Sequence, residues 1–203
     1  MNPLISVWLH PKQTARYVIE HKSIAYSLLL ISLGFIGSIA SSLTDSNLYP
    51  NLSAGTIVIA TIIFSPIIGI IGAFIFAGIT YLMGRLLKGT GSFFDVFKAL
   101  SLGYIPYILI IPLYLGWMVM DPDSYFYLYS DFNIGLILLS AMISLIPAVF
   151  TIVINIAGVA EAHHFSNWRA FFSVILPAVV LIILLFVALL VFTVFFIAVV
   201  GTF

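Results

Sequence analysis

Five long apolar stretches make up most of this chain, and the polar gaps between them alternate in the sign of their charge. The stretches cover residues 24–43, 55–84, 99–119, 133–159 and 170–200. A helix needs about 20 mostly apolar residues to cross a membrane, so each stretch is long enough. Since 63% of the residues are hydrophobic and only 7% are charged, a water-soluble globule is excluded. The sequence therefore predicts an all-α, polytopic membrane protein with a bundle of five transmembrane helices.

The basic residues predict how this bundle is oriented. All seven Lys and Arg residues lie in residues 1–23, in the gap between the second and third stretches, and at Arg169. The two other gaps contain only acidic charges. Short loops rich in Lys and Arg stay on the cytoplasmic side of a membrane. We therefore expect a cytoplasmic N-terminus and, after five crossings, a C-terminus outside.

Residues 1–23 have the pattern of a short amphipathic helix that lies on the membrane surface. Pro11 suits the first turn of a helix, and Lys12, Arg16 and Glu20 recur at a spacing of four. Apolar residues take the opposite side, and Trp8 is placed to anchor the segment in the interface. The basic face predicts attraction to anionic lipid, without specifying a lipid site.

Small and helix-breaking residues in the apolar stretches predict how the helices pack. A stripe of small side chains, which lets another backbone approach closely, consists of Ser65, Gly69, Ala73 and Ala77. Gly34 and Gly37 in the first stretch could supply a matching surface. We expect this stripe to pack inside the bundle, with a homodimer or another membrane protein as the alternative. Prolines predict kinks in four of the five helices.

Polar residues within the stretches are all neutral. An ionisable group at mid-depth usually marks a proton or ion pathway, and its lack argues against an ion-coupled carrier. Tyr104, Ser144 and Asn155 are the candidates for lining a groove between the proline-kinked helices. Two function classes stay open: a membrane scaffold or adaptor that presents its cytoplasmic loops, and a lipid-transfer or small-solute permeation protein that uses such a groove.

The cytoplasmic segments lack the spacing of known catalytic motifs. Residues 84–92 have the glycines of a phosphate-binding loop but no Lys directly after the second one. Ser92 and Asp95 instead predict a capping box that starts a helix. Glu161, His163 and His164 are the candidate metal ligands, although their spacing matches no common zinc motif. Since Cys is absent, thiol chemistry is excluded, and we predict no enzymatic activity, no cofactor and no nucleic-acid partner.

The cytoplasmic segments also hold the side chains expected to contact a protein or lipid partner. These are Trp8, Lys12, Arg16, Arg85, Lys88, Glu161, His163, His164 and Arg169.

Taken together, four segments resemble the YIP family, the Ypt/Rab-interacting membrane proteins. They are residues 3–14 with the Trp8 and His10-Pro11 positions, residues 84–93, residues 103–106, and residues 161–170. The resemblance implies a single membrane domain over residues 1–203, with five spans and no known enzymatic activity.

The eukaryotic relatives lie in Golgi and endoplasmic reticulum membranes and bind small GTPases through long cytosolic regions. Only residues 1–23 precede the first stretch here, so small-GTPase binding is not carried over. The chain is more similar to the compact prokaryotic members, which predicts a location in the plasma membrane.

Overall fold

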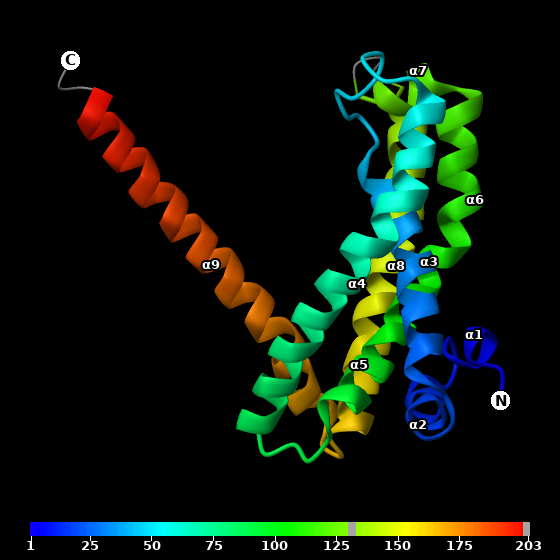
Figure 1. Ribbon diagram of the computed structural model, residues 1–203, viewed down its shortest axis with the longest axis vertical. Helices are drawn as coiled ribbons and strands as arrows, with labels where there is room; N and C mark the ends of the chain where they lie inside the picture. The colour runs from blue at the N-terminus through cyan, green and yellow to red at the C-terminus, as the bar shows by residue number, and fades with distance from the viewer. Residues whose placement is uncertain (130–132, 201–203) are drawn as a thin grey trace.

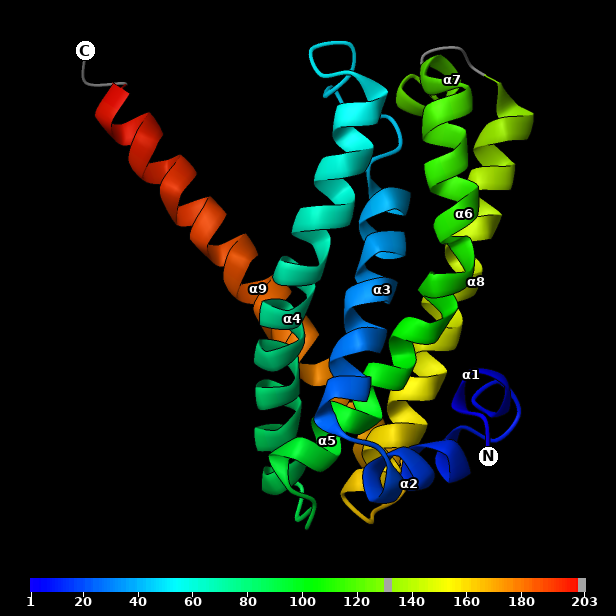
Figure 2. The same cartoon turned by 45° about the vertical axis from the view of Figure 1, so that its right-hand side comes forward.

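In the computed structural model, which describes residues 1–129 and 133–200, that part of the chain consists of helices joined by turns and loops, without a strand. Four long helices run side by side in Figures 1 and 2: α3 (Ile24–Ser42), α4 (Ala54–Leu86), α6 (Ile105–Met120) and α8 (Ile134–Ala162). The fifth, α9 (Asn167–Val200), starts beside α4 and α8 and then leaves the bundle at an angle (Figure 1).

Four segments of the described chain are long and apolar enough to cross a membrane. They are Ile24–Ser42, Ala54–Leu86, Phe93–Met120 and Ile134–Ala162. The third joins α5 (Phe93–Ser101), the short 3₁₀ helix η1 (Leu102–Tyr104) and α6. The all-helical class of membrane protein is thus confirmed, whereas the count of five crossings stays a prediction.

Local sequence signals explain where the short helices begin. Helix α2 (Pro11–His21) starts at the expected proline and buries Thr14, Ala15 and Val18 on one side. Helix α5 starts after the predicted capping box, because Ser92 Oγ accepts from the Asp95 N–H at 3.2 Å and Asp95 Oδ2 accepts from the Ser92 N–H at 2.9 Å. The candidate span Phe93–Met120 is therefore longer than the predicted stretch 99–119, because it includes α5, which continues through η1 into α6.

Glycines bring α3 and the third span into backbone contact. A Cβ atom at Gly34 would lie 2.5 Å from the carbonyl oxygen of Tyr104, and one at Gly37 would overlap the carbonyl oxygen of Tyr107. These two glycines thus face η1 and α6 and not the small-residue stripe of α4. All four residues of that stripe are buried within the chain, and Gly69 lies against the ring of Phe35.

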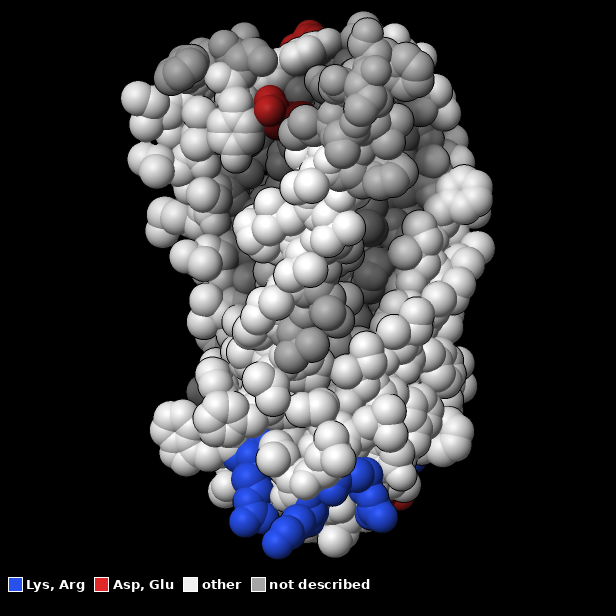
Figure 3. All heavy atoms as spheres, turned by 90° about the vertical axis from the view of Figure 1, so that its left-hand side faces the viewer, with Lys and Arg blue, Asp and Glu red and all other residues white. Residues whose placement is uncertain are grey.

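The Lys and Arg side chains gather at one end of the bundle, because successive helices alternate in direction. The end we call the basic end holds α1 (Pro3–Ser6), α2, residues 87–92 and residues 163–166 (Figure 2). The acidic end holds residues 43–53 and α7 (Pro122–Phe126). Figure 3 shows Lys and Arg gathered at the first end and acidic side chains at the second, with an uncharged band between them.

Candidate functional site

The basic end is built around α2, which lies across the ends of α5 and α8. Arg16 Nε donates to Glu161 Oε1 at 2.6 Å and so joins α2 to the last turn of α8. Lys98 Nζ donates to the carbonyl oxygen of Ile19 at 2.8 Å, which satisfies one of the carbonyls that the end of α2 leaves open. The hydrogen bond and negative charge of Glu161 raise the pKa of Arg16 further, so this contact stays ionic.

His163 caps the C-terminus of α8 and turns its side chain inward. The residue is only 1% exposed, and neither ring nitrogen has a hydrogen-bond partner among the described residues. Its ring stacks on Tyr81 with 6.2 Å between the centroids. The Thr90 N–H donates to the His163 carbonyl at 3.2 Å, so the turn after α4 is bonded to the turn after α8.

Three glycines around this turn make room for the imidazole and its backbone. A Cβ atom at Gly84 would overlap the His163 ring, and one at Gly89 would lie 2.5 Å from its Nδ1 atom. A Cβ atom at Gly91 would overlap the Ala162 carbonyl oxygen. The glycines of residues 84–91, whose spacing partly resembles a phosphate-binding loop, therefore form a cradle for the side chain and backbone of His163.

The surroundings of His163 favour its neutral form. Burial lowers the pKa of the ring, the nearby charges of Arg85 and His164 lower it as well, and Asp95 acts in the opposite direction. A neutral, enclosed imidazole fills space and packs against aromatic rings. His163 is therefore withdrawn from the surface that a partner could touch.

The three candidate metal ligands have separate environments. Glu161 is bonded to Arg16, His163 is buried, and His164 is exposed. Within residues 1–129 and 133–200, no three His, Cys, Asp or Glu side chains are arranged to hold a metal ion. The structure does not bring the three together as a metal site.

The other predicted contact residues fall into two groups. Trp8 donates from its indole N–H to the Leu4 carbonyl at 2.9 Å and packs edge-on against Phe150 of α8, and Arg85 donates to the Gly89 carbonyl at 3.3 Å. By contrast, Lys12, Lys88 and Arg169 are exposed, and their side chains have no ion-pair or hydrogen-bond partner among the residues described.

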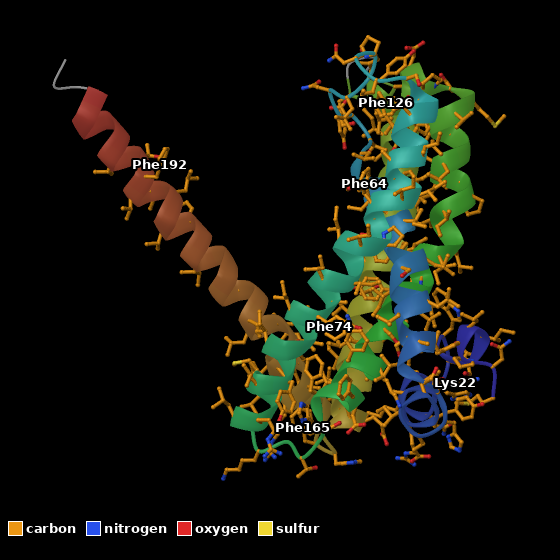
Figure 4. The ribbon with its side chains drawn as sticks, viewed as in Figure 1. Lys22, Phe64, Phe74, Phe126, Phe165 and Phe192 are labelled. Carbon is orange, nitrogen blue, oxygen red and sulfur yellow. The ribbon has the colours of Figure 1, made fainter. Side chains whose placement is uncertain are left out.

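Two further bases contribute to the basic end, although they were not among the candidates. Lys98 binds the Ile19 carbonyl, and Lys22 lies 5.3 Å from the centre of the Tyr26 ring (Figure 4), a cation–π distance. Lys22 directly precedes the Ser23 cap of α3, so its nearness to Tyr26 could have been read from the sequence. The contact of Lys98 joins residues far apart in the chain and carries no such signal.

The three predicted groove residues lie at separate packing contacts. The backbone of Tyr104 lies against Gly34, and the side chain of Asn155 lies against Gly103. Ser144 shares a hydrogen bond of 2.6 Å with the hydroxyl of Tyr114. Thr151, one turn before Asn155, donates to the Gly103 carbonyl at 2.6 Å. Ser144, Thr151 and Asn155 thus connect α8 to the third span, whereas Tyr104 packs against α3.

Comparison with known proteins gives one match. The sequence profile of the Yip1 domain matches residues 5–190. No curated protein and no solved structure matches the chain. The matched range contains α2, the glycine cradle, the His163 turn and the spans from α3 to α8. The chain therefore belongs to the Yip1 domain family, in agreement with the resemblance seen in its loops.

Proposed function

We propose that this Yip1-family protein is a membrane scaffold or adaptor, without enzymatic activity, that presents its basic end to a protein or lipid partner. The observation that carries the proposal is the contrast within the basic end. Arg16 and Lys98 hold its helices together, whereas Lys12, Lys88 and Arg169 are exposed and have no partner in the described chain. A preformed surface with free charges is suited to docking, because little order must be gained when a partner binds.

The composition of the spans supports the same proposal. Every Asp, Glu, Lys, Arg and His within the four candidate spans lies within six residues of a span end. Transport of ions or protons normally uses ionisable groups at mid-depth. The middle of the four candidate spans, which contains only uncharged residues, therefore favours a structural role over ion transport.

The alternative is a lipid-transfer or small-solute permeation protein. That reading needs a groove lined by Tyr104, Ser144 and Asn155. The hydrogen bond between Ser144 and Tyr114 and the contact of Asn155 with Gly103 use these side chains for helix packing. We therefore rank the alternative below the scaffold.

Photo-crosslinking in native membranes tests the scaffold directly. A photo-reactive residue at His164 or Lys88 should give a discrete adduct, and the same residue at Asn51 of the acidic end should not. Substituting Lys88 and Arg169 with Gln should weaken the adduct formed at His164. Equal adducts from both ends would contradict the proposal. Solute or lipid flux in proteoliposomes, above that of protein-free vesicles, would instead support the permeation alternative.

We further propose five crossings of the plasma membrane, with the basic end in the cytoplasm and the C-terminus outside. The chain contains no Cys, so a single introduced Cys is a clean reporter. In intact cells, a membrane-impermeant maleimide should label Asn51→Cys and leave Lys88→Cys unlabelled until the cells are opened. The reverse pattern would invert the orientation.

A further inference from the structure

A cavity of about 450 Å³ lies at the basic end, between α2, α8 and the start of α9. Its apolar wall comes from three residues of α8: Val153, Ile156 and Ala157. Its polar rim includes Lys12 and Gln13 of α2 and Asn167 of α9, and its lining contains no acidic residue. The cavity thus has an apolar side and a side that is polar and basic.

The apolar wall lies on α8, several residues inside the end of that helix. Val153 precedes the helix cap His163 by ten residues, which is about 15 Å along a helix axis. The same helix is one of the candidate spans, and half of the surface of Val153 is exposed. A molecule in the cavity can therefore extend along the side of a candidate membrane span.

The basic rim has a free charge of the right sign for an anion. Lys12 has no partner among the described residues, in contrast to Arg16 on the next turn, which is bonded to Glu161. His10 precedes α2 without a side-chain hydrogen bond to its first turn. The open N–H groups of that turn and the positive end of the helix dipole add to the attraction of Lys12 for a negative group.

We propose that this cavity binds one anionic phospholipid. The phosphate lies against Lys12 and the first turn of α2, and one acyl chain follows the wall of Val153, Ile156 and Ala157. The apolar wall selects a lipid over a soluble phosphate, and the basic rim selects an anionic headgroup over a zwitterionic one. This site shares Lys12 with the adaptor surface but does not rest on the adaptor role, because the cavity is formed within one chain and needs no docked protein.

Native mass spectrometry of the full chain in detergent tests the site. The protein is titrated with phosphatidylglycerol, with phosphatidylcholine of the same acyl chains, and with glycerol phosphate as the soluble headgroup. We expect wild type to retain phosphatidylglycerol in preference to both. Lys12→Gln should reduce this retention about fivefold, the usual effect of one base near an anionic membrane lipid. The matched control is Lys22→Gln, which removes a base at the other end of α2, outside the cavity, and should leave retention unchanged.

A second variant tests the apolar wall. Val153→Trp places bulk in the cavity at a half-exposed position, so the fold tolerates it, and it should reduce the retention of phosphatidylglycerol. Equal losses from Lys12→Gln and Lys22→Gln would overturn the site in favour of general charge attraction. Equal binding of glycerol phosphate and phosphatidylglycerol would overturn it as well. Neither result would alter the crosslinking pattern that tests the adaptor role, so the two proposals fail separately.

Discussion

The two ends of the bundle are held together by opposite means. At the acidic end, large aromatic side chains fill the space between the helices and donate hydrogen bonds to the backbone. At the basic end, the absence of side chains at glycines lets two turns and a histidine come together. The comparison shows that the helices of a small membrane bundle can be packed by large aromatic side chains at one end and by glycines, which have no side chain, at the other.

Tyr125 of α7 is the centre of the acidic end. It is fully buried, and its hydroxyl donates to the Ala40 carbonyl of α3. Its ring packs edge-on against Trp117 of α6 and against Phe126, which is labelled in Figure 4. One aromatic residue therefore connects α3, α6 and α7.

The basic end depends on Gly84, Gly89 and Gly91, which surround His163 and its backbone. The ring of Phe165, labelled at this end in Figure 4, has its centroid 5.2 Å from that of the His163 ring. The two ends should consequently respond to opposite substitutions. Truncating a buried aromatic side chain should destabilise the acidic end, and adding a methyl group at one of the glycines should destabilise the basic end.

Tyr125→Ala is expected to have the largest effect. Truncating a fully buried aromatic side chain costs about 3–5 kcal/mol through lost contacts and the cavity left behind. Tyr125→Phe, the matched control, removes only the hydroxyl and its bond to Ala40 and should cost about 1 kcal/mol. Both can be measured as free energies of unfolding in mixed detergent micelles. A cost for Tyr125→Ala no greater than that of Tyr125→Phe would mean that the acidic end is not held by aromatic bulk.

Gly84→Ala is expected to rank second, at about 1–3 kcal/mol, because overpacking forces the enclosed His163 to move. The control is Gly72→Ala in the same helix, where a Cβ atom meets no other atom within 4 Å. That substitution should be neutral or slightly stabilising, since Ala favours a helix over Gly.

The same clash can be isolated with a double-mutant cycle. If Gly84→Ala acts through the imidazole, its cost should fall in a His163→Ala background. An unchanged cost would show that Gly84 is needed for another reason. The packing of the basic end would then not depend on the room that this glycine leaves for His163.

Local patterns in the sequence predicted the features that depend on neighbouring residues. The start of α2 at Pro11 and the capping box of Ser92 and Asp95 are confirmed, because both are decided within one helical turn. The four candidate spans also follow from apolar length alone.

Features that depend on distant segments were not predictable in the same way. The periodicity of α3 showed that Gly34 and Gly37 share a face, but not that this face meets Tyr104 and Tyr107. Likewise, nothing beside His163 in the chain indicates that the glycines of residues 84–91 enclose it. Both contacts arise when helices far apart in the sequence pack together.

Acidification should lower the stability of the packing around His163 at the basic end. This effect should be smaller than those of Tyr125→Ala and Gly84→Ala. Burial holds the pKa of His163 below its ordinary value of 6.5, so the unfolded chain binds a proton more readily than the folded one. The contribution of neutral His163 is fully present above pH 6.5 and is lost as the pH falls from there toward the lowered pKa. Melting temperatures at pH 7.5 and pH 5 should therefore differ more in wild type than in His163→Gln. Equal differences would assign the pH response to other groups.

Breaking the contact between Arg16 and Glu161 should have the smallest effect, because the Arg16 side chain is 63% exposed and water screens the pair. Its loss should loosen α2 without unfolding the spans. A Cys introduced at Val18, which is buried on the inner side of α2, should react faster with a thiol reagent when Arg16→Gln is added. Lys12→Gln removes a charge from the same helix but no hydrogen bond or ion pair to α8, so in lipid-free detergent it should leave the rate unchanged. If both variants accelerated the reaction equally, net charge and not the bond to Glu161 would hold α2 in place, and the basic end would be less firmly built than its hydrogen bonds imply.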